Sequence, residues 1–187
     1  MRSIAVLLTI LLAGATSGLV AQAPEVFTAA AQVKSATGAM SGALEVRITR
    51  YTPDFDRTAM ETALRQGGYP AFLNALRNAP VSGQLVLAGG TAHTIRYARE
   101  TTEAGRRTIV LVTESPVLFI GGGVTADPRS RVGYELAVVE IQLGPSGPGS
   151  GTMAAAARVR PDGKGGVILD DYAEQLITLS AVARKPS

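Results

Sequence analysis

Short segments in which apolar and polar residues alternate fill most of the chain after residue 82, and they restrict the possible folds more than any other feature. Stretches rich in Gly and Pro separate them at close, fairly regular spacing. The segments cover residues 83–89, 93–100, 106–114, 117–121, 133–143, 152–161, 166–171 and 175–184. Alternation with a period of two places one face of a strand in a core and the other in water. The pattern predicts a mainly antiparallel β fold, either a sandwich or a barrel.

Two further strands are expected nearer the N-terminus. Residues 25–35 and residues 43–51 both alternate apolar with more polar side chains. Thr37 and Gly38 lie between them and suit a turn. These two segments therefore predict a pair of half-buried antiparallel strands.

The period changes from two to a helical one near residues 56–79. Gly67 and Gly68 interrupt this region, and Pro70 follows at a position that suits the first turn of a second helix. Pro80 ends the pattern, since the residue before a proline disfavours helix. The sequence predicts one helical hairpin inserted into the β-rich domain, which makes the fold class α+β.

The alanine run at residues 154–157 allows two interpretations. Alanine favours helix, so the run is compatible with a helical segment. The flanking sequences GPSGPGSG and PDGKGG are both typical of hairpin loops. We therefore expect a strand between them.

The N-terminal residues 1–23 have the layout of a secretory signal peptide. One positive charge at Arg2 precedes an apolar stretch, and small residues stand at Ala21 and Ala23. Cleavage after Ala23 is expected, with an uncleaved anchor as the alternative. Residues 24–187 would then form one domain in the periplasm or outside the cell, with no remaining membrane span.

Composition excludes several classes of site. The chain has no cysteine, which rules out disulfides, thiolate metal sites and a lipid anchor on cysteine. Lys and Arg number 18 against 15 Asp and Glu, a balance that does not indicate a nucleic-acid or membrane-surface binder. No stretch matches a nucleotide-binding pattern, and no cofactor is expected.

The arginine-rich stretch RYARETTEAGRR predicts a β-hairpin with a four-residue loop at Thr102–Gly105. That register places Glu100 opposite Arg107 and Tyr97 opposite Val110. Mixed charges are ordinary on a solvated strand face, so we expect the arginines to face water. The alternative is an anion-binding patch built from Arg96 and Arg107.

The candidates for catalysis are few. His93 is the one histidine, and the Gly-x-Ser-x-Gly pattern of a nucleophile elbow is absent from the sequence. Asp54 and Asp56 precede the expected helix, where carboxylates favour the helix N-terminus. Asp170 and Asp171 are neighbours on an expected strand, so their side chains should diverge. The sequence therefore assigns no catalytic, cofactor-binding or metal-binding residue.

The succession of segments from Arg50 to Lys185 resembles a set of uncharacterised exported bacterial proteins. The segments that carry the resemblance are RYTPDFDRTAMETALRQGGYPAFLNALRNAP, SGQL, IRYARE, GRRTIVLVTESPV, GYELAVVEIQL, SGPGSG and LDDYAEQLITLSAVARK. The resemblance implies a signal peptide, a helical pair and a β-rich remainder. It implies no activity and no functional residue.

These observations favour a non-catalytic exported domain that binds a protein or small ligand at the cell envelope. One alternative is a hydrolase that uses carboxylates and His93. Another is a carrier of a small apolar molecule inside a barrel, lined by Tyr97, Phe119 and Tyr134. The sequence does not indicate an oligomeric state.

Overall fold

The structure is a computed structural model that describes residues 23–35, 38–87, 90, 92–117, 133–145, 148–163, 166–172 and 176–186. Within these residues the chain forms one helix and nine strands. In chain order they are β1 Glu25–Ser35, β2 Gly38–Ile48, α1 Asp54–Asn78, β3 Gly83–Leu87, β4 Ala92–Glu103, β5 Arg106–Thr113, β6 Leu136–Leu143, β7 Gly149–Pro161, β8 Val167–Asp171 and β9 Ile177–Arg184. Most of the expected strand at 117–121 lies outside the described residues.

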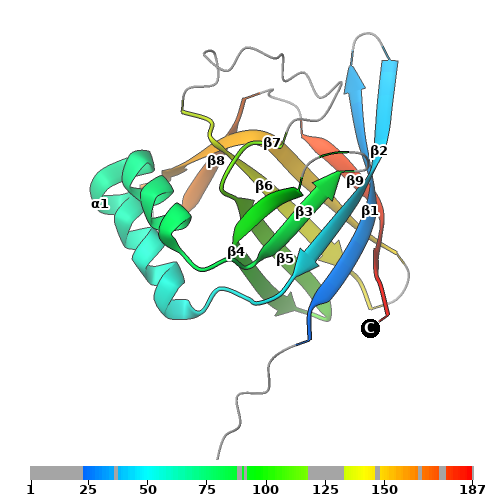
Figure 1. The fold of residues 1–187 in the computed structure, drawn as a ribbon, viewed down its shortest axis with the longest axis horizontal. Coiled ribbons are helices and arrows are strands. Elements are labelled where there is room, and N and C mark those ends of the chain that lie inside the picture. Colours follow the sequence, from blue (N-terminus) through cyan, green and yellow to red (C-terminus); the bar gives the residue numbers. More distant parts are fainter. Residues whose placement is uncertain are drawn as a thin grey trace, which may run out of the picture.

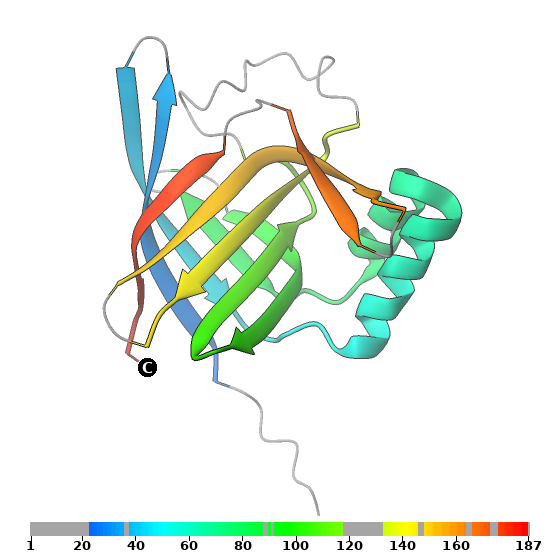
Figure 2. The same cartoon turned by 180° about the vertical axis from the view of Figure 1, so that it is seen from behind.

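The strands close into an antiparallel barrel (Figures 1 and 2). The sheet order is β6-β5-β4-β3-β2-β1-β9-β7-β8, and an additional pairing of β6 with β7 completes a ring of eight strands. The ninth strand, β8, pairs with the second half of β7, while β9 pairs with its first half. The expected antiparallel β fold is confirmed, and of the two expected architectures the chain adopts the barrel.

Buried side chains fill the barrel interior. A ring of eight strands encloses a space about wide enough for its own inward-facing side chains. The largest of these are less than 2% exposed: Phe27, Leu44, Leu85, Ile95, Ile109, Leu111, Ile141, Met153, Ile177 and Leu179. Because the interior is occupied by the protein itself, a binding site must be sought on the outside of the barrel.

The expected helical hairpin is wrong, because the region forms a single helix with a break. Only Gly68 leaves helical geometry inside α1, with φ 66° and ψ −161°. Two helices in a hairpin need a connection of about two to five residues, and here the helical backbone resumes immediately. The helix ends at Asn78, two residues before Pro80, as the sequence predicts.

Helix α1 packs against the outer wall of the barrel and forms a second core there (Figures 1 and 2). Met60, Leu73 and Leu76 of the helix are buried in it. On the barrel side it includes Val112, Leu136, Ala154 and Ala157. The alanine run is thus a strand, as expected, and its small side chains allow the helix to lie close to β7.

The predicted register of the β4–β5 hairpin is wrong. The strands extend to Glu103 and Arg106 and are joined by the two residues Ala104 and Gly105, whose φ angles are 49° and 76°. Positive φ at both central residues is typical of the two-residue turn whose twist matches that of the flanking strands. In this register Tyr97 lies opposite Val112 instead of Val110.

Candidate binding pocket on the outer wall of the barrel

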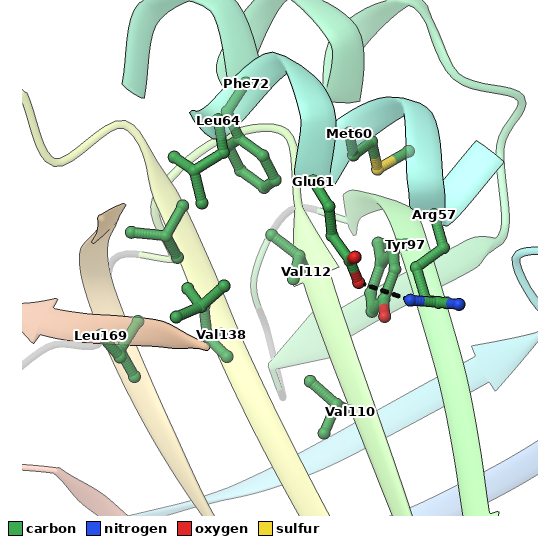
Figure 3. Close-up of a pocket in the computed structure, with 12 residues that line it drawn as sticks. Arg57, Met60, Glu61, Leu64, Phe72, Tyr97, Val110, Val112, Val138 and Leu169 are labelled. Atoms are coloured by element: carbon green, nitrogen blue, oxygen red, sulfur yellow. Dashed lines mark hydrogen bonds and ion pairs between the residues drawn. The ribbon is translucent and has the colours of Figure 1, made fainter. Parts of the chain in front are cut away.

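A pocket of about 220 Å³ lies between helix α1 and the outer wall of the barrel (Figure 3). Its wall comes from five neighbouring strands, β4 to β8, and its roof comes from the helix. The strand residues are Tyr97, Val110, Val112, Val138, Val159, Val167 and Leu169, and the helix residues are Arg57, Met60, Glu61, Leu64 and Phe72. The lining is almost entirely apolar. We call this space the outer-wall pocket.

Valines at outward-facing strand positions create the wall. In β5, Ile109 and Leu111 point into the barrel, while Val110 and Val112 point outward under the helix. A strand with one wet face would carry polar residues at those outward positions. Here they are apolar because the helix covers part of this face of the sheet.

The break in helix α1 contributes to the roof. Met60 and Leu64 precede Gly68, and Phe72 follows it, yet all three line the same pocket (Figure 3). Beyond the break, the Tyr69 hydroxyl accepts a hydrogen bond of 3.0 Å from the backbone N–H of Glu135. This bond ties the second part of the helix to the segment that leads into β6.

A cluster of paired charges forms the polar part of the pocket lining. Arg57 Nη1 donates to Glu61 Oε1 at 2.6 Å, and its Nε donates to Asp54 Oδ1 at 3.2 Å. The hydrogen bonds to these two carboxylates raise the pKa of Arg57. Burial raises the pKa of Tyr97, although the nearby Arg99 guanidinium acts in the opposite direction. The tyrosine is therefore a neutral hydroxyl at ordinary pH.

The structure does not form the alternative anion-binding patch. Arg96 binds Glu114 and the carbonyl oxygen of Ala79, whereas Arg107 belongs to a different cluster. Arg107 Nη2 lies 2.6 Å from Glu25 Oε2 and 2.7 Å from Glu100 Oε2. Both arginines are thus occupied by carboxylates of the chain itself.

The expectation that the arginines of the β4–β5 hairpin face water is wrong for Arg107. Its guanidinium lies 5.8 Å from the centre of the Phe27 ring, which is part of the barrel core, and its side chain is 22% exposed. Glu25 at the start of β1 is buried, and the Tyr51 hydroxyl donates to it at 2.6 Å. We call Glu25, Tyr51, Glu100 and Arg107 the Glu25 cluster.

The electrostatics of the Glu25 cluster favour the charged forms of Glu25 and Arg107. Burial by itself would raise the pKa of the Glu25 carboxyl, but hydrogen bonds from Arg107 and Tyr51 outweigh it and lower the pKa. Burial would likewise lower the pKa of Arg107, yet its bonds to Glu100 and Glu25 raise it. The cluster is therefore a charged network that stabilises the fold.

His93 lies apart from the outer-wall pocket. Its Nδ1 is 3.4 Å from the Ser115 hydroxyl, and burial lowers its pKa. In the part of the chain that the structure describes, no carboxylate hydrogen-bonds to this histidine. A hydrolase triad would need such a carboxylate on the second ring nitrogen. The hydrolase alternative, with carboxylates and His93, stays a prediction.

The acidic candidates do not meet His93 either. Asp54 and Asp56 lie in the first turn of α1, bound to Arg57 and Arg50 respectively. Asp170 on β8 binds Arg158 and Arg160, with distances of 3.1 and 3.0 Å. Among the described residues no group of three or more potential metal ligands occurs.

The aromatic residues expected inside the barrel are distributed differently. Tyr97 lines the outer-wall pocket instead of the interior. Tyr134 lies under the Arg158 guanidinium at 4.9 Å and packs edge-on against Tyr172. Phe119 lies outside the described residues. A carrier function would therefore use a site other than the interior.

The sequence carried one signal for the outer-wall pocket. Residues 109–112, IVLV, and residues 137–139, AVV, are apolar at consecutive positions, so both faces of these strands require cover. The first of these runs supplies Val110 and Val112, and the second supplies Val138. The runs indicate a second apolar layer, but not which element covers it or where a space remains.

Comparison with protein families, curated proteins and solved structures finds no match for this chain. In the described residues no helix is long and apolar enough to cross a membrane. The fold and the site therefore define the class of the protein by themselves: an eight-stranded antiparallel barrel with a helix-covered apolar pocket on its outer wall.

Proposed function

We propose that this chain is a non-catalytic exported protein that binds a small apolar molecule in the outer-wall pocket. The observation that carries the proposal is the lining: outward-facing aliphatic side chains of four strands meet Met60, Leu64 and Phe72 across a space of about 220 Å³. Apolar pockets with a few polar groups are the usual form of small-molecule sites.

The volume limits the ligand. An apolar cavity of about 150 Å³ accommodates benzene, with six carbon atoms. By proportion, the outer-wall pocket has room for about nine carbon atoms. Ligands of that size gain a fraction of a kcal/mol per atom in ordinary cases, so we expect dissociation constants between about millimolar and micromolar.

The proposal is tested with 1-octanol and methyl-labelled protein. We expect octanol to shift the NMR signals of Val110, Val112 and Val138 in a saturable way. The variant Val138→Phe places a larger side chain in the pocket and should weaken octanol binding about tenfold, the effect of losing about 1.4 kcal/mol.

The matched control is Val81→Phe, the same change at a valine that is 46% exposed and lies outside the pocket. This variant should bind octanol as the wild type does. The proposal fails if octanol shifts no pocket signal, or if the two variants weaken binding equally.

A location at the cell envelope is part of the proposal and rests on the N-terminal sequence. Residues 1–22 lie outside the described part of the chain. The resemblance to exported bacterial proteins supports the same location and stays a prediction.

A further inference from the structure

Arg99 does not line the outer-wall pocket itself but lies beside Tyr97, which does. It lies directly opposite Val110 in the β4–β5 pairing and two residues after Tyr97. Opposite residues of an antiparallel pair point to the same face, with Cβ atoms about 5 Å apart. The guanidinium of Arg99 therefore belongs to the same outer face as Tyr97 and Val110, both of which line the pocket.

Arg99 differs from most arginines of the chain in having no carboxylate partner in the described residues. The arginines that do form ion pairs are Arg50, Arg57, Arg65, Arg96, Arg107, Arg158, Arg160 and Arg184. Arg99 instead lies beside the neutral Tyr97 hydroxyl. Its positive charge is therefore not compensated by a direct contact.

The carboxylates nearest to Arg99 along the surface are already engaged. Asp54 and Glu100 border the same shallow depression as Arg99. Asp54 accepts a hydrogen bond from Arg57, and Glu100 accepts one from Arg107. The acid that lines the outer-wall pocket itself, Glu61, is bound to Arg57 at 2.6 Å. An incoming anion would thus meet Arg99 without displacing an existing ion pair.

We propose that the ligand of the outer-wall pocket is an aliphatic monocarboxylic acid. Its hydrocarbon tail lies among the valines and Phe72, and its carboxylate binds Arg99 and the Tyr97 hydroxyl. This inference rests on the proposed function, because it assigns the ligand of the same pocket. A guanidinium with an adjacent hydroxyl donor suits a carboxylate, and the charge-assisted bonds are the stronger kind.

The chain length follows from the pocket volume. Room for about nine carbon atoms corresponds to a medium-length acid such as octanoate or nonanoate. A much longer acid would extend beyond the apolar lining and leave its tail in water.

The test compares octanoate with 1-octanol, which has the same chain length but no charge. Wild-type protein should bind octanoate more tightly than octanol by calorimetry or NMR titration. Arg99→Gln should weaken octanoate binding about tenfold or more, since hydrogen bonds to charged groups are worth about 1.5–3 kcal/mol. It should change octanol binding less than twofold.

The matched control is Arg106→Gln. Arg106 is exposed, lies next to the β4–β5 turn and likewise forms no ion pair with a described carboxylate, but it lies opposite Glu103, six residues along β4 from Tyr97. It should leave the binding of both compounds unchanged. Retained octanol binding shows in each variant that the fold and the pocket are intact.

The outcomes separate this inference from the proposed function. If octanol binds wild-type protein at least as tightly as octanoate, or if Arg106→Gln weakens octanoate as much as Arg99→Gln, the carboxylate assignment is wrong while the pocket remains a binding site. If neither compound binds, both proposals are wrong.

Discussion

At the scale of single residues, the Glu25 cluster shows how a charged group is accommodated in this barrel. Glu25 is 6% exposed, yet it receives hydrogen bonds from Tyr51 and Arg107 and an ion pair from Arg184. A buried carboxylate without such partners would cost several kcal/mol. Glu25 therefore links β1 to β5 through Arg107, to β9 through Arg184, and to the segment after β2 through the Tyr51 hydroxyl.

The lowered pKa of Glu25 predicts a dependence of stability on pH. A carboxyl whose pKa is lower in the folded than in the unfolded protein stabilises the fold above its unfolded pKa, near 4.5. This contribution is lost as the pH falls through the folded pKa. We expect the free energy of unfolding in urea to decrease from pH 6 to pH 3.

The comparison variant for this prediction is Glu25→Gln, which is neutral at every pH. At pH 6 it should be less stable than the wild type by about 1–3 kcal/mol, the cost of leaving buried hydrogen-bonding groups poorly matched. The difference should shrink as the pH falls below 4.5 toward the lowered pKa of Glu25. A difference that stays constant over this range would contradict the prediction.

At the scale of elements, the break in helix α1 depends on one glycine, Gly68. Gly68 has φ 66° and ψ −161°, a region of backbone geometry that residues with a Cβ strongly avoid. The helix on either side of it contributes to the roof of the outer-wall pocket. The break therefore determines how both parts of the helix rest on the barrel.

We predict that Gly68→Ala destabilises the protein by about 1–3 kcal/mol through backbone strain. A Cβ at this position would meet no atom closer than 3.9 Å, so steric overlap adds little to the effect. Urea unfolding measures the change. The control is Gln66→Ala, an exposed helical position where we expect less than about 0.5 kcal/mol. An unchanged or higher stability for Gly68→Ala would show that the break is not required.

At the scale of the whole molecule, the chain builds two apolar layers on one sheet. One layer fills the barrel, and the other lies between its outer wall and α1. The first strand begins at Glu25, two residues after Ala23, the last residue before the predicted cleavage site. Removal of residues 1–23 would therefore leave every strand of the barrel intact.

We predict that the chain, expressed in a bacterium with a secretion system, is recovered from the periplasm or medium with Pro24 as its first residue. N-terminal sequencing and intact mass measurement check this. A control with Arg2→Glu and two aspartates in the apolar stretch should stay in the cytoplasm at full length. Recovery of wild-type protein that still begins at Met1 would favour the uncleaved anchor.

The sequence by itself determined most of the strands, the position of the helical region and the absence of disulfides, because these depend on local periodicity and composition. The apolar runs at 109–112 and 137–139 already required apolar cover on both faces of their strands. Only the tertiary structure decided that the barrel closes by the pairing of β6 with β7. It also decided that Arg107 binds Glu25, a residue 82 positions away in the sequence. Such contacts depend on which distant strands become neighbours when the sheet curls into a ring, and no local pattern specifies that. The outer-wall pocket was also decided only by the tertiary structure, because it is the space that the broken helix leaves unfilled over the valines of the barrel wall.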